Sequence, residues 1–62
     1  MKRADLLKTL RQIAKDRGVA YDITEDGSHS KVWLGHRFVI VPRHNEINEL
    51  TAKGILRDAK GD

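Results

Sequence analysis

The sequence predicts one α+β domain in which two helices frame three antiparallel strands. Three observations predict it: an apolar repeat of helical period near the N-terminus, a period of two in the middle, and turn residues that divide the middle into short segments. A chain of 62 residues can bury one small core, so residues 1–62 are treated as a single domain. Both helices are expected to pack on one face of the sheet.

The first helix is predicted over about Arg3 to Arg17. Its apolar residues recur at helical spacing, and they are Leu6, Leu7, Leu10, Ile13 and Ala14. Gly18 follows at once, as is typical of the residue after a helix. The opposite helical face is rich in lysine and arginine, which suits solvent, phosphate or an acidic partner.

A first strand is predicted after Gly18. Val19, Tyr21 and Ile23 alternate with polar neighbours there, a pattern that indicates a half-buried strand. The pair Asp26-Gly27 then predicts a turn.

A second strand is predicted over about 28–34 and a third over about 37–41. The pair Gly35-His36 is expected to form the turn between them. Pro42 has no N–H for a ladder hydrogen bond and therefore ends the third strand.

The last element is predicted to be a short helix. The segment from residue 43 to residue 50 is polar and is expected to be irregular, with Thr51 as the N-cap of the helix. Ile55, Leu56 and Ala59 would face inward, and Gly61 would end the helix.

A two-residue loop at 35–36 also fixes the register of the second and third strands. It pairs Leu34 with Arg37 and, by the same count, Lys31 with Ile40. One face is then purely aliphatic and is assigned to the helices; it carries Val32, Leu34, Val39 and Val41. The other is expected to be open to solvent or a partner; it carries His29, Lys31, Trp33, Phe38 and Ile40.

Composition limits the functional classes. Twelve lysines and arginines against nine acidic residues give a net charge of +3, which favours a polyanionic partner. The absence of cysteine excludes disulfides and thiolate metal sites and favours the cytoplasm. No apolar run is long enough for a membrane span, and no helix-turn-helix spacing is visible, so neither membrane association nor direct DNA binding is expected.

Two motifs carry a resemblance to a known family. Gly27-Ser28-His29 follows the first turn, and Val41-Pro42-Arg43-His44 ends the third strand. Both motifs lie in the run GSHSKVWLGHRFVIVPRH, from residue 27 to residue 44, which is followed by EINELTAKGILRDA. Through these segments the chain resembles, over nearly its whole length, the HicA family of bacterial toxins, small ribonucleases of toxin–antitoxin pairs.

The resemblance implies a fold like the double-stranded-RNA-binding domain, cleavage of messenger RNA, and inhibition by a cognate HicB-like antitoxin. The catalytic histidine of that family corresponds to His29. Family members often carry an aromatic residue three places after this histidine, where the present chain has Val32, followed by Trp33.

The chemistry of RNA gives His29 a suitable role. RNA carries its own nucleophile, the 2′-OH, so cleavage needs proton transfer and stabilisation of charge on phosphate oxygens. Histidine exchanges protons near neutral pH. Gly27 and Ser28 leave room for the RNA backbone. Lys31 lies on the same strand face as His29 and is a candidate contact for the phosphate. We expect no metal or cofactor, since no carboxylate pair has a spacing typical of a two-metal site.

Five further residues are candidate substrate contacts, and each of them also has an ordinary structural explanation. Trp33 either stacks on a base or packs against Phe38. The other candidates are Arg37, Arg43, His44 and Lys53, each of which also suits ordinary surface charge or, for His44, ordering of a loop. His36 is expected to be inert in its turn, and a zinc site formed by the three histidines is disfavoured by their wide spacing.

Two functional classes therefore remain. The first is a metal-independent endoribonuclease of the toxin type, inhibited by an antitoxin that covers His29 and places acidic residues over Lys31 and the basic helix. The second is a non-catalytic module of the same fold that binds RNA or an antitoxin.

Overall fold

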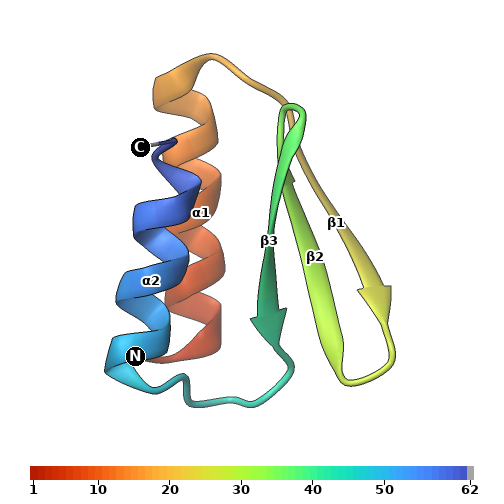
Figure 1. The fold of residues 1–62 in the computed structure, drawn as a ribbon, viewed down its shortest axis with the longest axis vertical. Helices are drawn as coiled ribbons and strands as arrows, with labels where there is room; N and C mark the ends of the chain where they lie inside the picture. The colour runs from red at the N-terminus through yellow and green to blue at the C-terminus, as the bar shows by residue number, and fades with distance from the viewer. Residues whose placement is uncertain (62) are drawn as a thin grey trace.

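The computed structural model describes residues 1–61 and has the predicted order of elements (Figure 1). The elements are α1 (Arg3–Arg17), β1 (Tyr21–Asp26), β2 (His29–Leu34), β3 (Arg37–Pro42) and α2 (Glu49–Ala59). The strands form one antiparallel sheet in the order β1-β2-β3. Both helices lie on the same side of this sheet, so the α+β prediction is confirmed. No helix within residues 1–61 combines the length and apolar character needed to cross a membrane.

Both hairpins are closed by two-residue turns that begin with glycine. Gly27 and Gly35 have φ of 63° and 65°, the left-handed region that the first position of a II′-type hairpin turn requires. The first turn consists of Gly27-Ser28, one residue later than predicted, because Asp26 still pairs with His29. The predicted register of β2 with β3, from Leu34 opposite Arg37 to Lys31 opposite Ile40, is confirmed.

The hydrophobic core lies between the helices and one face of the sheet. It contains Leu6, Leu10, Ala14, Val32, Leu34, Val39, Val41, Ile47, Ala52, Ile55 and Ala59. All four aliphatic strand residues assigned to the helices are buried, as predicted. Leu7, Ile13 and Leu56, also expected inward, are only half-buried at the margin of the core.

The start of α2 differs from the prediction. The helix begins at Glu49, and Asn48, not Thr51, is the N-cap: its side-chain oxygen accepts hydrogen bonds from the N–H groups of Leu50 (2.8 Å) and Thr51 (3.4 Å). Thr51 therefore lies inside the first turn.

The segment before α2 is also more ordered than expected. Lys2 and Glu46 form an antiparallel bridge, and the N–H of Ile47 donates to the carbonyl oxygen of Met1 at 2.7 Å. This contact holds Ile47 in the core. Its burial was not predicted, because the residues around it in the sequence are polar.

Candidate functional site

His29 is the first residue of β2 and follows directly after the Gly27-Ser28 turn. Its side chain is exposed, and because the next residue, Ser30, is buried on the helix side, His29 lies on the opposite face of the sheet. The hydroxyl oxygen of Ser28 lies 3.2 Å from Nδ1 of the imidazole. Nε2 is therefore the ring nitrogen that remains to meet a ligand.

Asp26 is a neighbour of His29 that sequence reasoning missed. The two residues are direct cross-strand partners in β1 and β2, and both are exposed. Side chains of directly opposed residues share a face with their Cβ atoms about 5 Å apart. A two-residue hairpin loop places the residue three positions before the histidine opposite it, so correct placement of the turn would have predicted this pair.

A buried hydroxyl anchors the strand immediately after His29. Ser30 points to the helix side of the sheet and is fully buried. Its Oγ accepts a hydrogen bond from Nη2 of Arg3 at 2.6 Å and donates one to Oε1 of Glu25 at 3.0 Å. Arg3 also donates from Nε to the carbonyl oxygen of Pro42 at 3.0 Å. The start of α1 is thus joined to all three strands at the end of the sheet that carries His29.

Arg43, a predicted substrate contact, lies beside this network. Its Nε is 2.9 Å from Oε2 of Glu25, and Nη1 donates to the carbonyl oxygen of Gly27 at 3.1 Å. Its backbone N–H donates to the carbonyl oxygen of Ser28 at 3.2 Å. Arg43 therefore holds the turn in place with part of its guanidinium group. Because half of its side chain is exposed, the remaining donors are still accessible.

The open face continues from His29 along β2 and β3. Trp33 and Phe38 contact one another with ring centroids 4.9 Å apart, and Nζ of Lys31 lies 5.0 Å from the centre of the Phe38 ring. Phe38 is 43% exposed and Ile40 is 42% exposed. A cation, two aromatic rings and an aliphatic side chain thus form one surface next to the histidine.

The three remaining predicted residues lie in three separate regions. His44 lies in the bend after β3, two positions beyond Pro42, which is the cross-strand partner of His29. Lys53 is exposed on α2, in the helix layer, and so does not belong to the open face. Arg37 pairs with Leu34, about 16 Å along β2 from His29.

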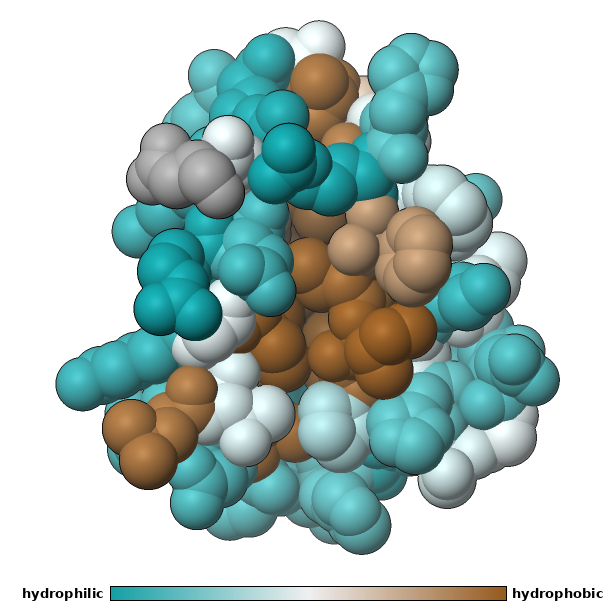
Figure 2. Space-filling model, in the orientation of Figure 1, coloured by the Kyte–Doolittle hydropathy of each residue, from teal (hydrophilic) through white to brown (hydrophobic). Residues whose placement is uncertain are grey.

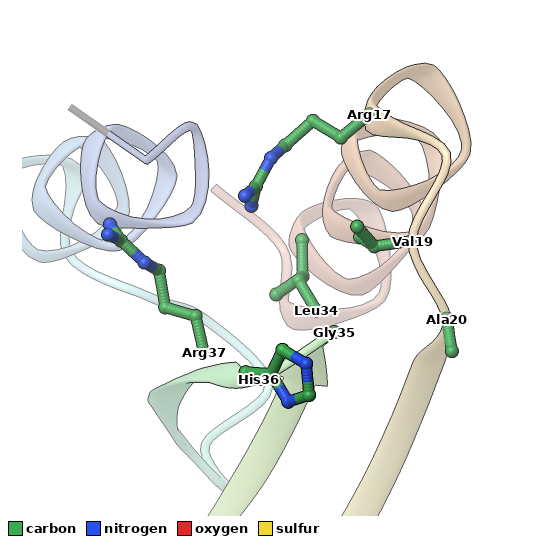
Figure 3. Close-up of a pocket in the computed structure, with 7 residues that line it drawn as sticks. All are labelled: Arg17, Val19, Ala20, Leu34, Gly35, His36 and Arg37. Atoms are coloured by element: carbon green, nitrogen blue, oxygen red, sulfur yellow. The ribbon is translucent and has the colours of Figure 1, made fainter.

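Arg37 and His36 instead line a separate hollow of about 640 Å³ at the other end of the sheet (Figure 3). Arg37 and Arg17 enter it from two sides, and each donates to a carbonyl oxygen at the end of α2: Asp58 at 3.4 Å and Ala59 at 2.9 Å. Cationic side chains are favourable at this end of a helix, so both arginines have a structural role.

The three histidines are not gathered in one group in the part of the chain that the structure describes. Within residues 1–61, no three side chains from histidine, cysteine, aspartate and glutamate come together in a group that could hold a metal ion. His36 and His29 lie at opposite ends of β2.

Comparison of this chain with protein families, with curated proteins and with solved structures finds no match.

Proposed function

We propose that this protein is an endoribonuclease toxin of the HicA type, which cleaves messenger RNA with His29 as its catalytic residue and without a metal ion. The observation that carries the proposal is the exposed imidazole of His29 on the uncovered face of the sheet, with the Ser28 hydroxyl 3.2 Å from Nδ1. The resemblance carried by Gly27-Ser28-His29 and by residues 41–44 supports the same assignment.

The proposed reaction is an internal transfer on the RNA. The 2′-oxygen attacks the adjacent phosphorus, the bond from phosphorus to the 5′-oxygen breaks, and a 2′,3′-cyclic phosphate and a 5′-hydroxyl result. When Nδ1–H of His29 donates to Ser28, Nε2 carries a lone pair and accepts the proton of the 2′-OH. The 5′-oxygen takes up a proton as it leaves, either from the imidazolium or from water.

The open face offers contacts for single-stranded RNA. The half-buried ring of Trp33 and the exposed ring of Phe38 suit base stacking, and the ammonium group of Lys31 suits a phosphate oxygen. Stacking on aromatic side chains tolerates all four bases, so the proposal implies limited base specificity from these two residues.

The test is incubation of a defined single-stranded RNA with purified protein in EDTA, comparing wild type with His29→Ala. His36→Ala is the matched control, because it removes an exposed histidine at the far end of β2. We expect His29→Ala to lose at least about 100-fold in cleavage rate, with His36→Ala unchanged. Equal cleavage by wild type and His29→Ala would refute the catalytic role. RNA binding without cleavage by any variant would favour the non-catalytic module.

A HicB-like antitoxin is the proposed protein partner. It would inhibit by covering His29 and the adjoining open face, with acidic residues over Lys31. The basic surface of α1, which the sequence suggested as a second contact, lies in the helix layer on the other side of the sheet and so falls outside this interface. Binding should then slow amide hydrogen exchange across residues 29–40. Complex formation that leaves these amides unchanged would show that the antitoxin binds elsewhere.

A further inference from the structure

The two edge strands, β1 and β3, differ in whether their outward N–H and C=O groups are protected from pairing with another strand. In β1 the N–H of Ile23 points outward, and the carboxylate of Asp22 accepts its hydrogen bond at 2.9 Å. Glu25 and Asp26 add two further acidic side chains to the strand. Charged residues along an edge discourage another strand from pairing with it. The edge formed by β1 is therefore protected.

The outer edge of β3 has its backbone groups free. The bond from the N–H of Arg43 to the carbonyl of Ser28 continues the β2–β3 ladder, so residues 37, 39 and 41 also bond to β2. The N–H and C=O groups of Phe38 and Ile40 consequently point away from the sheet. None of the side-chain, turn or loop hydrogen bonds found among residues 1–61 involves these groups. The next outward carbonyl, that of Pro42, is already bonded to Arg3.

Apolar side chains accompany this free edge. Phe38 and Ile40 are the two large hydrophobic residues of the sheet that are exposed. Figure 2 shows hydrophobic residues gathered down the middle of the molecule, along β3 and between β3 and α2. Leu56, half-buried on α2, packs against the same core. An exposed hydrophobic edge strand without charged residues at its centre is a template for another strand.

We propose that β3 pairs with β3 of a second copy of this chain, antiparallel and about a two-fold axis at Val39. Phe38 then lies opposite Ile40 of the second copy, and each of these residues donates and accepts one backbone hydrogen bond across the axis. An aromatic residue opposite a β-branched one is a favourable cross-strand pair. The pairing joins the two three-stranded sheets into one continuous sheet.

The pattern of residues favours this register over its neighbours. A shift that centres the axis on Ile40 would place Phe38 opposite Pro42, which has no N–H and whose carbonyl is already bonded to Arg3. A shift that centres it on Phe38 would place Ile40 opposite His36, a turn residue outside the strand. With the axis at Val39, Arg37 lies opposite Val41, so no like charges face one another.

A second copy fits this edge because the edge is complementary to itself. The same two residues provide both the outward hydrogen-bonding groups and the exposed apolar side chains, as an isologous contact requires. The paired ladder is short, so we expect a dimer that forms reversibly with concentration. In it, both open faces, each with its His29, lie on the same side of the joined sheet. The pairing itself does not depend on ribonuclease activity.

The first test is sedimentation equilibrium over a concentration series from about 10 µM to about 1 mM, where weak interfaces become populated. We expect the mass to rise from 7.1 kDa towards twice that value. Ile40→Lys should remain monomeric at every concentration, since lysine at an edge opposes pairing. Thr24→Lys is the control, because it adds the same charge to an exposed position on β1. A monomeric wild type, or a dimer unaffected by Ile40→Lys, would overturn the proposal.

The second test identifies the paired edge by measuring the distance between spin labels on the two copies. The chain has no cysteine, so Thr24→Cys gives a single site for a spin label. Pairing through β3 separates the two Thr24 Cα atoms by about 25 Å in an untwisted sheet, from strand spacing and rise. Pairing through β1 would bring them within about 10 Å. A dimer with the short distance would therefore refute the assignment to β3.

Discussion

Replacing Ser30 with alanine tests the buried contact that anchors β2 beside His29. The hydroxyl of this fully buried residue accepts a hydrogen bond from Arg3 at 2.6 Å and donates one to Glu25 at 3.0 Å. The substitution removes a single oxygen atom and both of these bonds. The backbone hydrogen bonds of β2 are untouched, so any loss of stability reports on the hydroxyl.

The expected loss follows from the charges and exposure of the two partners. A hydrogen bond to a charged group contributes about 1.5–3 kcal/mol net. Two effects reduce the sum for Ser30. Arg3 keeps its bond to the Pro42 carbonyl, and Glu25 keeps Arg43 at 2.9 Å while 47% of its side chain remains in water. We therefore expect a loss of about 2 kcal/mol of unfolding free energy, which lowers the Tm of a domain this small by about 8–16 °C.

The assay is urea and thermal unfolding followed by far-ultraviolet circular dichroism. Ser28→Ala is the matched control, because it removes an exposed hydroxyl two residues away. A double-mutant cycle with Arg3→Ala should give a coupling free energy above about 0.5 kcal/mol. A loss below about 0.5 kcal/mol for Ser30→Ala, the range of ordinary surface changes, would refute the reasoning.

Two further predictions concern the turns and the N-terminus. Gly27→Ala and Gly35→Ala each place a side chain at positive φ, which costs about 1–2 kcal/mol of unfolding free energy. Only at Gly35 would the new Cβ also lie 3.2 Å from Cβ of Val19. Thermal unfolding should therefore show the larger loss of stability for Gly35→Ala, and equal losses would contradict this. The Glu49 carboxylate raises the pKa of the Met1 ammonium, which in turn lowers the pKa of Glu49. This pair stabilises the fold between the lowered pKa of Glu49 and the raised pKa of the amine, and its contribution disappears as the pH rises past the latter. N-terminal acetylation should therefore lower the urea midpoint more at pH 6 than well above the raised pKa, where only the hydrogen bond from the terminal nitrogen to the Ile47 carbonyl oxygen remains to be disturbed. An equal change at both pH values would contradict the assignment.

The sequence predicted most reliably the features that residues close together in the chain determine, such as the turn at Gly35 and the strand register that follows from it. A two-residue loop that begins with Gly35 leaves one register for the strands it joins, and the alternation of side chains then separates Val32 and Val39 from Lys31 and Phe38. The same reasoning placed His29 on the open face. These predictions needed only contacts between residues close in the chain, and the structure confirms them.

Contacts between distant residues were not predictable in this way. The bond between Arg3 and Ser30 joins positions 27 residues apart, and nothing in the local pattern distinguishes Ser30 from an exposed strand serine. Ile47 is buried because the N-terminal residues bridge to its segment. The start of α2 was misplaced because Asn48 and Thr51 are both residue types that suit an N-cap, and the local sequence does not show that Asn48, next to the buried Ile47, takes this position.

The alternation of side chains along β2 divides the strand into two sets of positions with separate tasks. One set is buried on the helix side and consists of Ser30, Val32 and Leu34. The other set contributes little to the core and consists of His29, Lys31 and Trp33. Substitution in the second set can therefore change the chemistry of the open face while the core contacts stay as they are. A library randomised at positions 31, 33, 38 and 40 should consist mostly of folded proteins. In this small domain, the side chains of the open face can vary without changing the side chains that fill the core.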